Sequence, residues 1–415
     1  MVKKKSEKTS QPEINIGTVG HVDHGKTTLL YKLSGKWSDT HSEELKRGIT
    51  IRLGYSDAIF YQCAKCEGSE SYSTVKICPA HKVECSVLRK VSFVDAPGHE
   101  TLMATMLSGA AVMDGVLLLI AANEECPQPQ TKEHLMALEM IGIKNIIIVQ
   151  NKIDLVSKEQ ALENYRQIKE FVKGTIAENA MIIPLSAQHN VNINLLIEAI
   201  EKNFKTPERD ISKPPLMLVV RSFDINRPGI DIEDLNGGVL GGMLKQGILK
   251  VNDEIEIKPG RKVEKGGKSQ WLPIITKIAG LKAGGSSLDE VHPGGSIGLL
   301  TSLDPSIVKS DSLSGNVVGH KDKLPAVWES FELEPFLLER VVGSKKELKV
   351  EQIKKGEMLM LNVNSTATAG NVVELKKDRI KVNLKLPVCC NKEDKITISR
   401  KIENRFRLIG VAKIV

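Results

Sequence analysis

The chain has 415 residues and a formal net charge of +7, with 41% hydrophobic and 26% charged residues. This length predicts two or three domains, and the composition is that of a soluble globular protein. The longest apolar run, "VLLLIAA" at 116–122, is too short to span a membrane. The N-terminal segment "MVKKKSEKTSQPE" carries no apolar signal-peptide core, so we expect a cytoplasmic location.

Residues 1–12 are basic and polar, and we predict that they form a disordered tail. From residue 13 onward, apolar runs that are typical of buried strands alternate with helix-like segments at 130–141, 158–173 and 193–204. The strand-like runs are "INIGTV", "VSFVDA", "GVLLLIAAN", "NIIIVQNK" and "MIIPLSA". This alternation predicts βαβ units and a mostly parallel sheet.

The first strand-like run leads into "GHVDHGKT" (20–27), which matches the phosphate-binding pattern G-x-x-x-x-G-K-[ST]. Glycines let backbone N–H groups turn toward phosphates, Lys26 supplies a positive charge, and the Thr27 hydroxyl can ligate Mg²⁺. The helix-compatible segment "KTTLLYKL" follows at once, as this type of loop requires. We expect phosphate-side nucleotide contacts from Asp23, His24, Gly25, Lys26, Thr27 and Thr28.

Two later motifs indicate which base is bound. "NKID" (151–154) and "SA" (186–187) each follow a strand-like run, and open parallel sheets bind ligands at the carboxyl ends of their strands. A single carboxylate such as Asp154 can accept both the ring N–H and the exocyclic NH₂ of guanine, a donor pair that adenine lacks. Asn151 and the Ala187 backbone N–H can read the guanine O6 and N7. We expect base contacts from Asn151, Lys152, Asp154, Ser186, Ala187 and Gln188.

"DAPGH" (95–99) follows the strand-like run "VSFV", and "RGIT" places Thr50 between the phosphate loop and the next strand. Asp95 can hold Mg²⁺ through water, and the Gly98 N–H can meet a γ-phosphate. The Thr50 hydroxyl can complete the Mg²⁺ shell only while GTP is bound. Together these motifs predict a GTP switch.

Residues 63–85, "CAKCEGSESYSTVKICPAHKVEC", contain four of the seven cysteines. A cytoplasmic location disfavours disulfides, and nothing nearby suggests the base that a catalytic thiol needs. Cys63-x-x-Cys66 and Cys78-x-x-His81 share the spacing of a zinc knuckle, which predicts a Cys₃His site. Cys85 is the rival fourth ligand, and spacing favours His81. The remaining cysteines are interpreted as core or surface thiols: Cys126, Cys389 and Cys390.

The segment 205–215, "KTPERDISKPP", is rich in proline and charge and predicts a linker. Beyond it, short β-branched runs punctuated by glycine predict all-β structure. The expected fold is an α/β P-loop GTPase domain with a zinc-knuckle insert, followed by two all-β barrel domains. We predict the GTPase domain at 13–206, its zinc insert at 60–88, and the barrels at 207–324 and 325–415.

Most of the positive charge lies in the second predicted barrel. From Ala326 onward there are 18 Lys and Arg against 12 Asp and Glu, so six of the seven net charges fall in this region. The segment "SRKIENRFRLIG" surrounds Phe406 with Arg400, Lys401, Arg405 and Arg407. This pattern fits contact with nucleic-acid phosphates and fits equally well the solvent face of a barrel strand.

The motifs "VGHVDHGKTT", "KRGITI", "DAPGHE", "NKID" and "SA" together resemble the GTPase domain of the translation-factor superfamily. The β-rich half resembles the barrels that follow this domain in elongation factor Tu. Four further segments resemble the gamma-subunit family of archaeal and eukaryotic translation initiation factor two. They are "THSEELKRGITI", the cysteine insert, "AANEECPQPQTKEHL" and "PPLMLVVRSFDINRPG". In that family C-x-x-C commonly occurs twice, whereas here the last position is His81.

This resemblance implies a GTP-dependent switch that binds methionylated initiator tRNA and delivers it to the small ribosomal subunit. It implies a heterotrimer with alpha and beta subunits, and release of the tRNA on GTP hydrolysis. Catalysis is assigned by resemblance to His99, which orients water, assisted by Lys26 and Thr50. The implied cofactors are GTP or GDP, Mg²⁺ and Zn²⁺, with Mg²⁺ at Asp23, Thr27, the Gly48 backbone, Thr50 and, through water, Asp95.

Two related functions compete with this interpretation. A selenocysteine-specific elongation factor shares the GTPase domain and both barrels, and we expect it to carry a further C-terminal domain. The GTPase subunit of sulfate adenylyltransferase shares the architecture but is not expected to carry a zinc insert between the Thr50 and Asp95 motifs.

Overall fold

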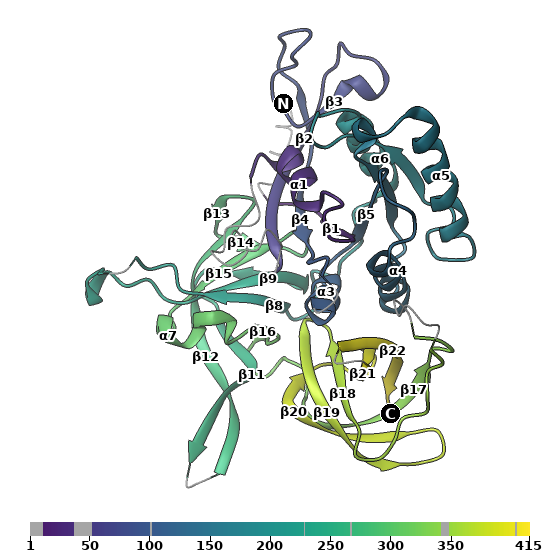
Figure 1. Ribbon diagram of the computed structural model, residues 1–415. Helices are drawn as coiled ribbons and strands as arrows, with labels where there is room; N and C mark the ends of the chain where they lie inside the picture. The colour runs from purple at the N-terminus through teal and green to yellow at the C-terminus, as the bar shows by residue number, and fades with distance from the viewer. Residues whose placement is uncertain are drawn as a thin grey trace. The chain divides into compact units, whose positions relative to one another are not determined.

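The computed structural model describes residues 11–36, 52–99, 102–227, 229–265, 268–341, 348–402 and 405–415 (Figure 1). The expected contacts of Gly48 and Thr50 lie outside these residues. The chain divides into two compact units, one formed by 1–106 with 113–207 and the other by 107–112 with 208–415.

The first unit contains a seven-stranded sheet in the order β3-β2-β4-β1-β5-β6-β7. The five predicted strand runs form its parallel part, and two strands pair antiparallel at one edge. The parallel part consists of β4 (Ser86–Asp95), β1 (Asn15–Gly20), β5 (Gly115–Ala121), β6 (Ile146–Asn151) and β7 (Met181–Pro184). The antiparallel edge consists of β2 (Gly54–Gln62) and β3 (Tyr72–Ser73). The central strands β1, β5 and β6 are buried along their whole length, which explains their continuous apolar runs.

Helices alternate with the strands of this sheet along the chain. They are α1 (Lys26–Ser34), α3 (Met103–Ala110), α4 (Pro129–Ile141), α5 (Lys158–Val172) and α6 (Ile193–Asn203). Helix α4 begins at a proline and ends at Gly142 in the left-handed conformation, and a capping box of Ser157 and Gln160 starts α5. One core cluster joins strands to helices through Ile16, Leu29, Phe93, Leu117, Ile147 and Ile200. The phosphate-binding pattern thereby sits between a buried strand and a packed helix.

The second unit contains a first barrel with strand order β11-β16-β8-β9-β15-β12-β13, in which β11 also pairs with β12 and closes the ring. Its strands are β8 (Leu216–Phe223), β9 (Val239–Gln246), β11 (Glu254–Lys265), β12 (Lys268–Ala283), β13 (Ser286–Leu288), β15 (Ile297–Thr301) and β16 (Val317–His320). Two short strands, β10 (Leu249–Lys250) and β14 (Glu290–Val291), pair with each other, and helix α7 covers Pro305–Val308. The β11–β12 hairpin extends well beyond the barrel (Figure 1).

The last six strands form a second closed barrel in the order β17-β20-β19-β18-β21-β22. They are β17 (Val327–Leu337), β18 (Met358–Val363), β19 (Thr366–Leu375), β20 (Ile380–Cys389), β21 (Ile396–Ile402) and β22 (Arg405–Ile414). The predicted fold class, a P-loop domain followed by two β-barrels, is therefore confirmed. In the part of the chain that the structure describes, every helix is too short or too polar to cross a membrane.

Candidate nucleotide site and metal centre

The phosphate loop connects β1 to α1, and Lys26 is its central side chain. Lys26 is 7% exposed, and its Nζ donates hydrogen bonds to the carbonyl oxygens of Gly20 at 3.0 Å and His21 at 2.6 Å. The loop therefore wraps around a buried ammonium group, which is the charge that a nucleotide phosphate needs. Asp23 is exposed in the left-handed conformation, and Thr28 is half-buried on the first turn of α1.

A buried carboxylate lies beside this loop. Asp95, at the end of β4, is fully buried and accepts hydrogen bonds from Thr27 Oγ1 at 2.9 Å and Thr18 Oγ1 at 2.8 Å. Thr27 uses its hydroxyl proton in this contact, so the oxygen keeps lone pairs for a cation. A hydroxyl and a carboxylate placed together supply the hard oxygen ligands that Mg²⁺ prefers. The residues present therefore fit the expected metal, and Thr18 is a partner that the sequence reasoning did not identify.

Gly98 lies directly against the phosphate loop. A Cβ atom at this position would be 2.4 Å from Lys26 Nζ and 2.9 Å from the Gly20 carbonyl oxygen. Only glycine allows the backbone to approach the ammonium group this closely. The structure thus places the residue of the expected γ-phosphate contact against the buried lysine. His99 follows as a half-buried residue, and its role in orienting water stays a prediction.

Asn151, the last residue of β6, ties the phosphate loop to the base-reading segment. Its side-chain Nδ2 donates to the His24 carbonyl oxygen at 2.9 Å, and its Oδ1 accepts from the Ala187 N–H at 3.0 Å. Asn151 is 2% exposed, so both bonds are shielded from water. Hydrogen bonds thus link three motifs that are widely separated in sequence: the phosphate loop, "NKID" and "SA". Whether Asn151 and Ala187 also read guanine O6 and N7 stays a prediction.

Asp154 and its neighbours lie at the same edge of the sheet. The Asp154 Oδ2 is 3.5 Å from Nε2 of His189, an exposed side chain. Lys152 adopts the left-handed conformation with φ of 63°, and Ser186 is buried with its Oγ accepting from the His189 N–H at 3.2 Å. Gln188 is exposed. The carboxylate is therefore reachable from solvent, as a group that reads a base must be.

His24 lies in the phosphate loop with its ring turned into the protein. Its ring is fully buried, with Nδ1 2.9 Å from the Leu119 carbonyl oxygen and Nε2 3.2 Å from Glu124 Oε2. Burial lowers the pKa of His24. Because its ring is occupied by these partners, only the His24 backbone is placed for a nucleotide. The partner Glu124 carries no motif that would have revealed it in the sequence.

The cysteine insert connects β2 to β4 and contains the short edge strand β3. Cys66 Sγ is 3.6 Å from Cys78 Sγ, and the His81 Nδ1 lies 3.8, 3.3 and 3.7 Å from the sulfurs of Cys63, Cys66 and Cys78. A tetrahedral zinc ion with Zn–S bonds of about 2.3 Å and Zn–N bonds of about 2.0 Å requires ligand separations of roughly 3.5–3.8 Å. This Cys₃His cluster is therefore compatible with zinc.

Cys85 lies beside this cluster and is buried, with its backbone N–H bonded to the Lys76 carbonyl oxygen at 2.8 Å. Burial raises the pKa of the Cys85 thiol, whereas a backbone hydrogen bond from Lys65 lowers the pKa of Cys63 to about 7. Burial also raises the pKa of the Cys66 thiol, to about 12, so these pKa directions do not separate Cys85 from the clustered ligands. The four mutually close ligand atoms are those of Cys63, Cys66, Cys78 and His81.

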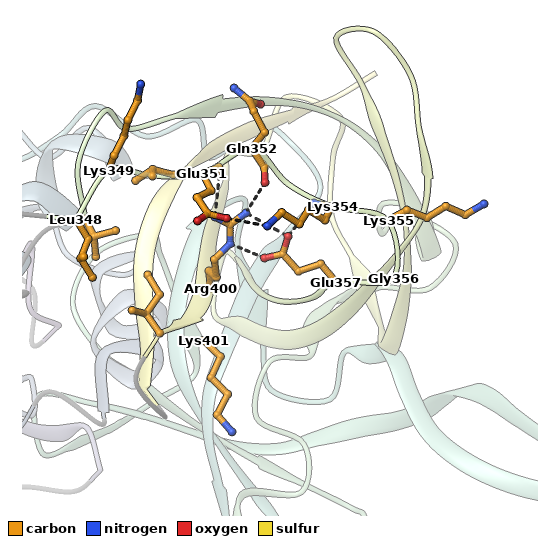
Figure 2. Close-up of a pocket in the computed structure, with 13 residues that line it drawn as sticks. Leu348, Lys349, Glu351, Gln352, Lys354, Lys355, Gly356, Glu357, Arg400 and Lys401 are labelled. Atoms are coloured by element: carbon orange, nitrogen blue, oxygen red, sulfur yellow. Dashed lines mark hydrogen bonds and ion pairs between the residues drawn. The ribbon is translucent and has the colours of Figure 1, made fainter.

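A separate cavity of about 540 Å³ lies on the second barrel, next to β21 (Figure 2). Arg400 pairs there with the Glu357 carboxylate and donates to the Glu351 carbonyl oxygen at 2.8 Å, and Lys354 pairs with Glu351. Figure 2 shows Lys349, Lys355 and Lys401 pointing away from this central network. The charges at the centre thus satisfy one another.

Arg407, another member of the predicted basic group, is 7% exposed. Together with the paired Arg400, this means that the four basic residues around Phe406 do not form one uniform exposed row. Their contact with nucleic acid stays a prediction.

Comparisons with known proteins match three parts of the chain to family models. These are "Elongation factor Tu GTP binding domain" at 11–206, "Elongation factor Tu domain 2" at 237–315 and "Initiation factor eIF2 gamma, C terminal" at 329–414. Translation initiation factor 2 subunit gamma of Methanothermobacter thermautotrophicus is 61% identical over 401 residues, covering 97% of this chain and 98% of that protein. Its counterpart from Methanococcus maripaludis is 58% identical over 407 residues, covering 98% and 99%.

Among solved structures, a bacterial selenocysteine-specific elongation factor aligns with a TM-score of 0.71 at 24% identity. The alignment covers 97% of this chain and 58% of that one. At this identity the likeness concerns the fold alone.

Proposed function

Because this chain belongs to the family of gamma subunits of translation initiation factor 2, we propose that it is a GTP-dependent switch that carries methionylated initiator tRNA to the small ribosomal subunit. It acts in the cytoplasm as the core of a heterotrimer with alpha and beta subunits, and GTP hydrolysis triggers release of the tRNA. The observation that carries this proposal is the 61% identity to a named gamma subunit along 97% of the chain.

In this proposal Lys26 of the phosphate loop exchanges its hydrogen-bond partners when the nucleotide binds. Lys26 Nζ leaves the carbonyl oxygens of Gly20 and His21 and pairs with the phosphates, while the backbone of the loop turns its N–H groups inward. Gly98 contacts the γ-phosphate because its backbone already lies against Lys26. Asp154 accepts the two guanine donors at the other end of the site.

Magnesium would be held by Thr27 and Asp95, together with Asp23, Thr50 and the Gly48 backbone. When bound, Mg²⁺ supplies positive charge that offsets the charge on the phosphates. His99 orients the attacking water, and loss of the γ-phosphate removes the contacts of Gly98 and Thr50. The backbone at Gly98 and His99 then relaxes, which lowers the affinity for the tRNA.

The zinc knuckle has a structural role in this proposal. Zn²⁺ would be held by Cys63, Cys66, Cys78 and His81, where it supplies a cross-link between two short loops. Four protein ligands would leave no open coordination position for a substrate.

The decisive experiment measures retention of methionylated initiator tRNA by the full chain with GTP and with GDP, alone and with candidate alpha and beta subunits. We expect binding at least about tenfold tighter with GTP in the assembled factor. Lys26→Ala should abolish this dependence because the loop loses its phosphate charge. Equal binding with GTP and GDP, or equal binding of elongator tRNA, would contradict the proposal. A preference for selenocysteine tRNA, or no binding of tRNA at all, would favour the competing functions instead.

A further inference from the structure

Helix α4 contacts the start of the phosphate loop through a side chain. We infer that His134 is a positioning residue, which fixes the first residue of the phosphate loop so that the loop is already shaped for guanine nucleotides. This inference rests on the proposed nucleotide-binding function and assigns a part in it to a residue that the sequence analysis gave no role.

The contact is a single buried hydrogen bond. The backbone N–H of Gly20 donates to His134 Nδ1 at 3.0 Å, and the His134 residue is 1% exposed. Gly20 is the last residue of β1 and the first residue of the phosphate-binding pattern. An acceptor from α4 therefore meets the chain at the point where the strand ends and the loop begins.

His134 must be neutral to play this part, because Nδ1 can accept only without a proton. Burial lowers the pKa of His134, the nearby Lys26, His21 and His24 lower it as well, and together they bring this pKa to about 3. The ring therefore carries its proton on Nε2 and offers Nδ1 as an acceptor at neutral pH. No carboxylate contributes to this shift, so the surrounding charges all favour the neutral ring.

The same residue, Gly20, also carries the resting contact of the buried lysine. Its carbonyl oxygen accepts from Lys26 Nζ at 3.0 Å, so both backbone polar groups of Gly20 have side-chain partners. Removing the acceptor on α4 leaves a buried N–H without a partner, which favours movement of Gly20 toward another acceptor. Lys26 would move with the Gly20 carbonyl, and the loop would have to be reordered each time a nucleotide binds.

Two substitutions separate the acceptor from the bulk of the ring. In His134→Asn the amide oxygen can occupy the place of Nδ1, whereas in His134→Gln it reaches the place of Nε2. We expect His134→Gln to weaken binding of a fluorescent GDP analogue about tenfold, the usual cost of an unpaired buried donor. His134→Asn should stay within about twofold of the unchanged protein. Circular dichroism and thermal unfolding would establish that each variant is folded.

Equal losses in both variants would mean that His134 acts through packing alone, and unchanged affinity in both would mean that the contact is irrelevant. Either result overturns the inference. If His134→Gln does not fold, nitrogen NMR of the unchanged protein shows which ring nitrogen of His134 carries the proton. A proton on Nδ1 would exclude the Gly20 contact and overturn the inference. Failure of the proposed function looks different: GDP would bind with the expected pattern while initiator tRNA is not retained.

Discussion

The phosphate loop and the zinc knuckle are held together in opposite ways. The loop is fixed by polar partners from four elements of the sheet and its helices, including Asp95, Asn151 and His134. The apolar cluster of the knuckle consists of Cys63, Cys78 and Cys85, with three partly buried neighbours packed against it. The first site therefore keeps its shape through the fold itself, whereas we propose that the second depends on a bound zinc ion.

Apolar side chains on the knuckle emphasise this difference. Val75 and Ile77 are 45% and 60% exposed, so they contribute little to a core. A segment that buries so little apolar surface cannot offset the conformational entropy of an ordered loop. We propose that metal coordination supplies what packing does not, because structural zinc contributes folding free energy directly.

The largest effect is expected from breaking the zinc site. Cys66→Ser removes one of four ligands, so bound zinc should fall from about one ion per chain to almost none. Residues 63–85 should then exchange their amide hydrogens quickly, while GDP affinity changes by less than about twofold. Metal analysis and hydrogen exchange measure the two effects.

Cys85→Ser is the matched control, since Cys85 is a buried cysteine outside the tetrahedral set. Zinc lost from Cys85→Ser but kept in His81→Ala would assign the fourth ligand to Cys85. A loss of GDP binding in Cys66→Ser would show that the two regions are not independent.

The second largest effect is expected from Asp154→Asn, which tests the base-binding end of the nucleotide site. Two hydrogen bonds to a carboxylate are lost, so GDP affinity should fall by roughly a hundredfold or more. Xanthine nucleotides should bind better than guanine nucleotides, because xanthine presents an oxygen where guanine has its NH₂ group. Titration calorimetry with both nucleotides gives the ratio, and Glu163→Gln on the exposed face of α5 is the control. An unchanged GDP affinity would remove Asp154 from the site.

The smallest expected effect is the contribution of His134 to the pH dependence of the free energy of unfolding. The unfolded chain takes up a proton on His134 below about pH 6.5, whereas the folded pKa of about 3 keeps the ring neutral. The free energy of unfolding should therefore fall as the pH falls through this window, by at most about 1.4 kcal/mol per pH unit from this residue. His134→Asn should lose that part of the slope in urea unfolding between pH 6.5 and 5. Identical slopes in both proteins would contradict the buried neutral ring.

The sequence predicted the fold class and the order of the motifs because both are local patterns. Continuous apolar runs mark strands buried on both faces, and "GHVDHGKT" between such a run and a helix marks a phosphate loop. The spacing of Cys63, Cys66, Cys78 and His81 is equally local, since four ligands within 19 residues leave few alternative arrangements. The zinc-compatible cluster could therefore be predicted without a structure.

Contacts between distant segments could only be decided by the tertiary structure. The bond from Asn151 to the His24 carbonyl oxygen spans 127 positions, and the bond from Gly20 to His134 spans 114. No sequence signal distinguishes His134 from an ordinary helical histidine, nor shows that the His24 ring turns inward to Leu119 and Glu124. The sequence by itself determined which groups are available to a nucleotide and a metal. Packing of α4 and β5 around the end of β1 determined which side chains stabilise the phosphate loop through buried hydrogen bonds. Burial is decisive because it removes the water that would compete for these bonds.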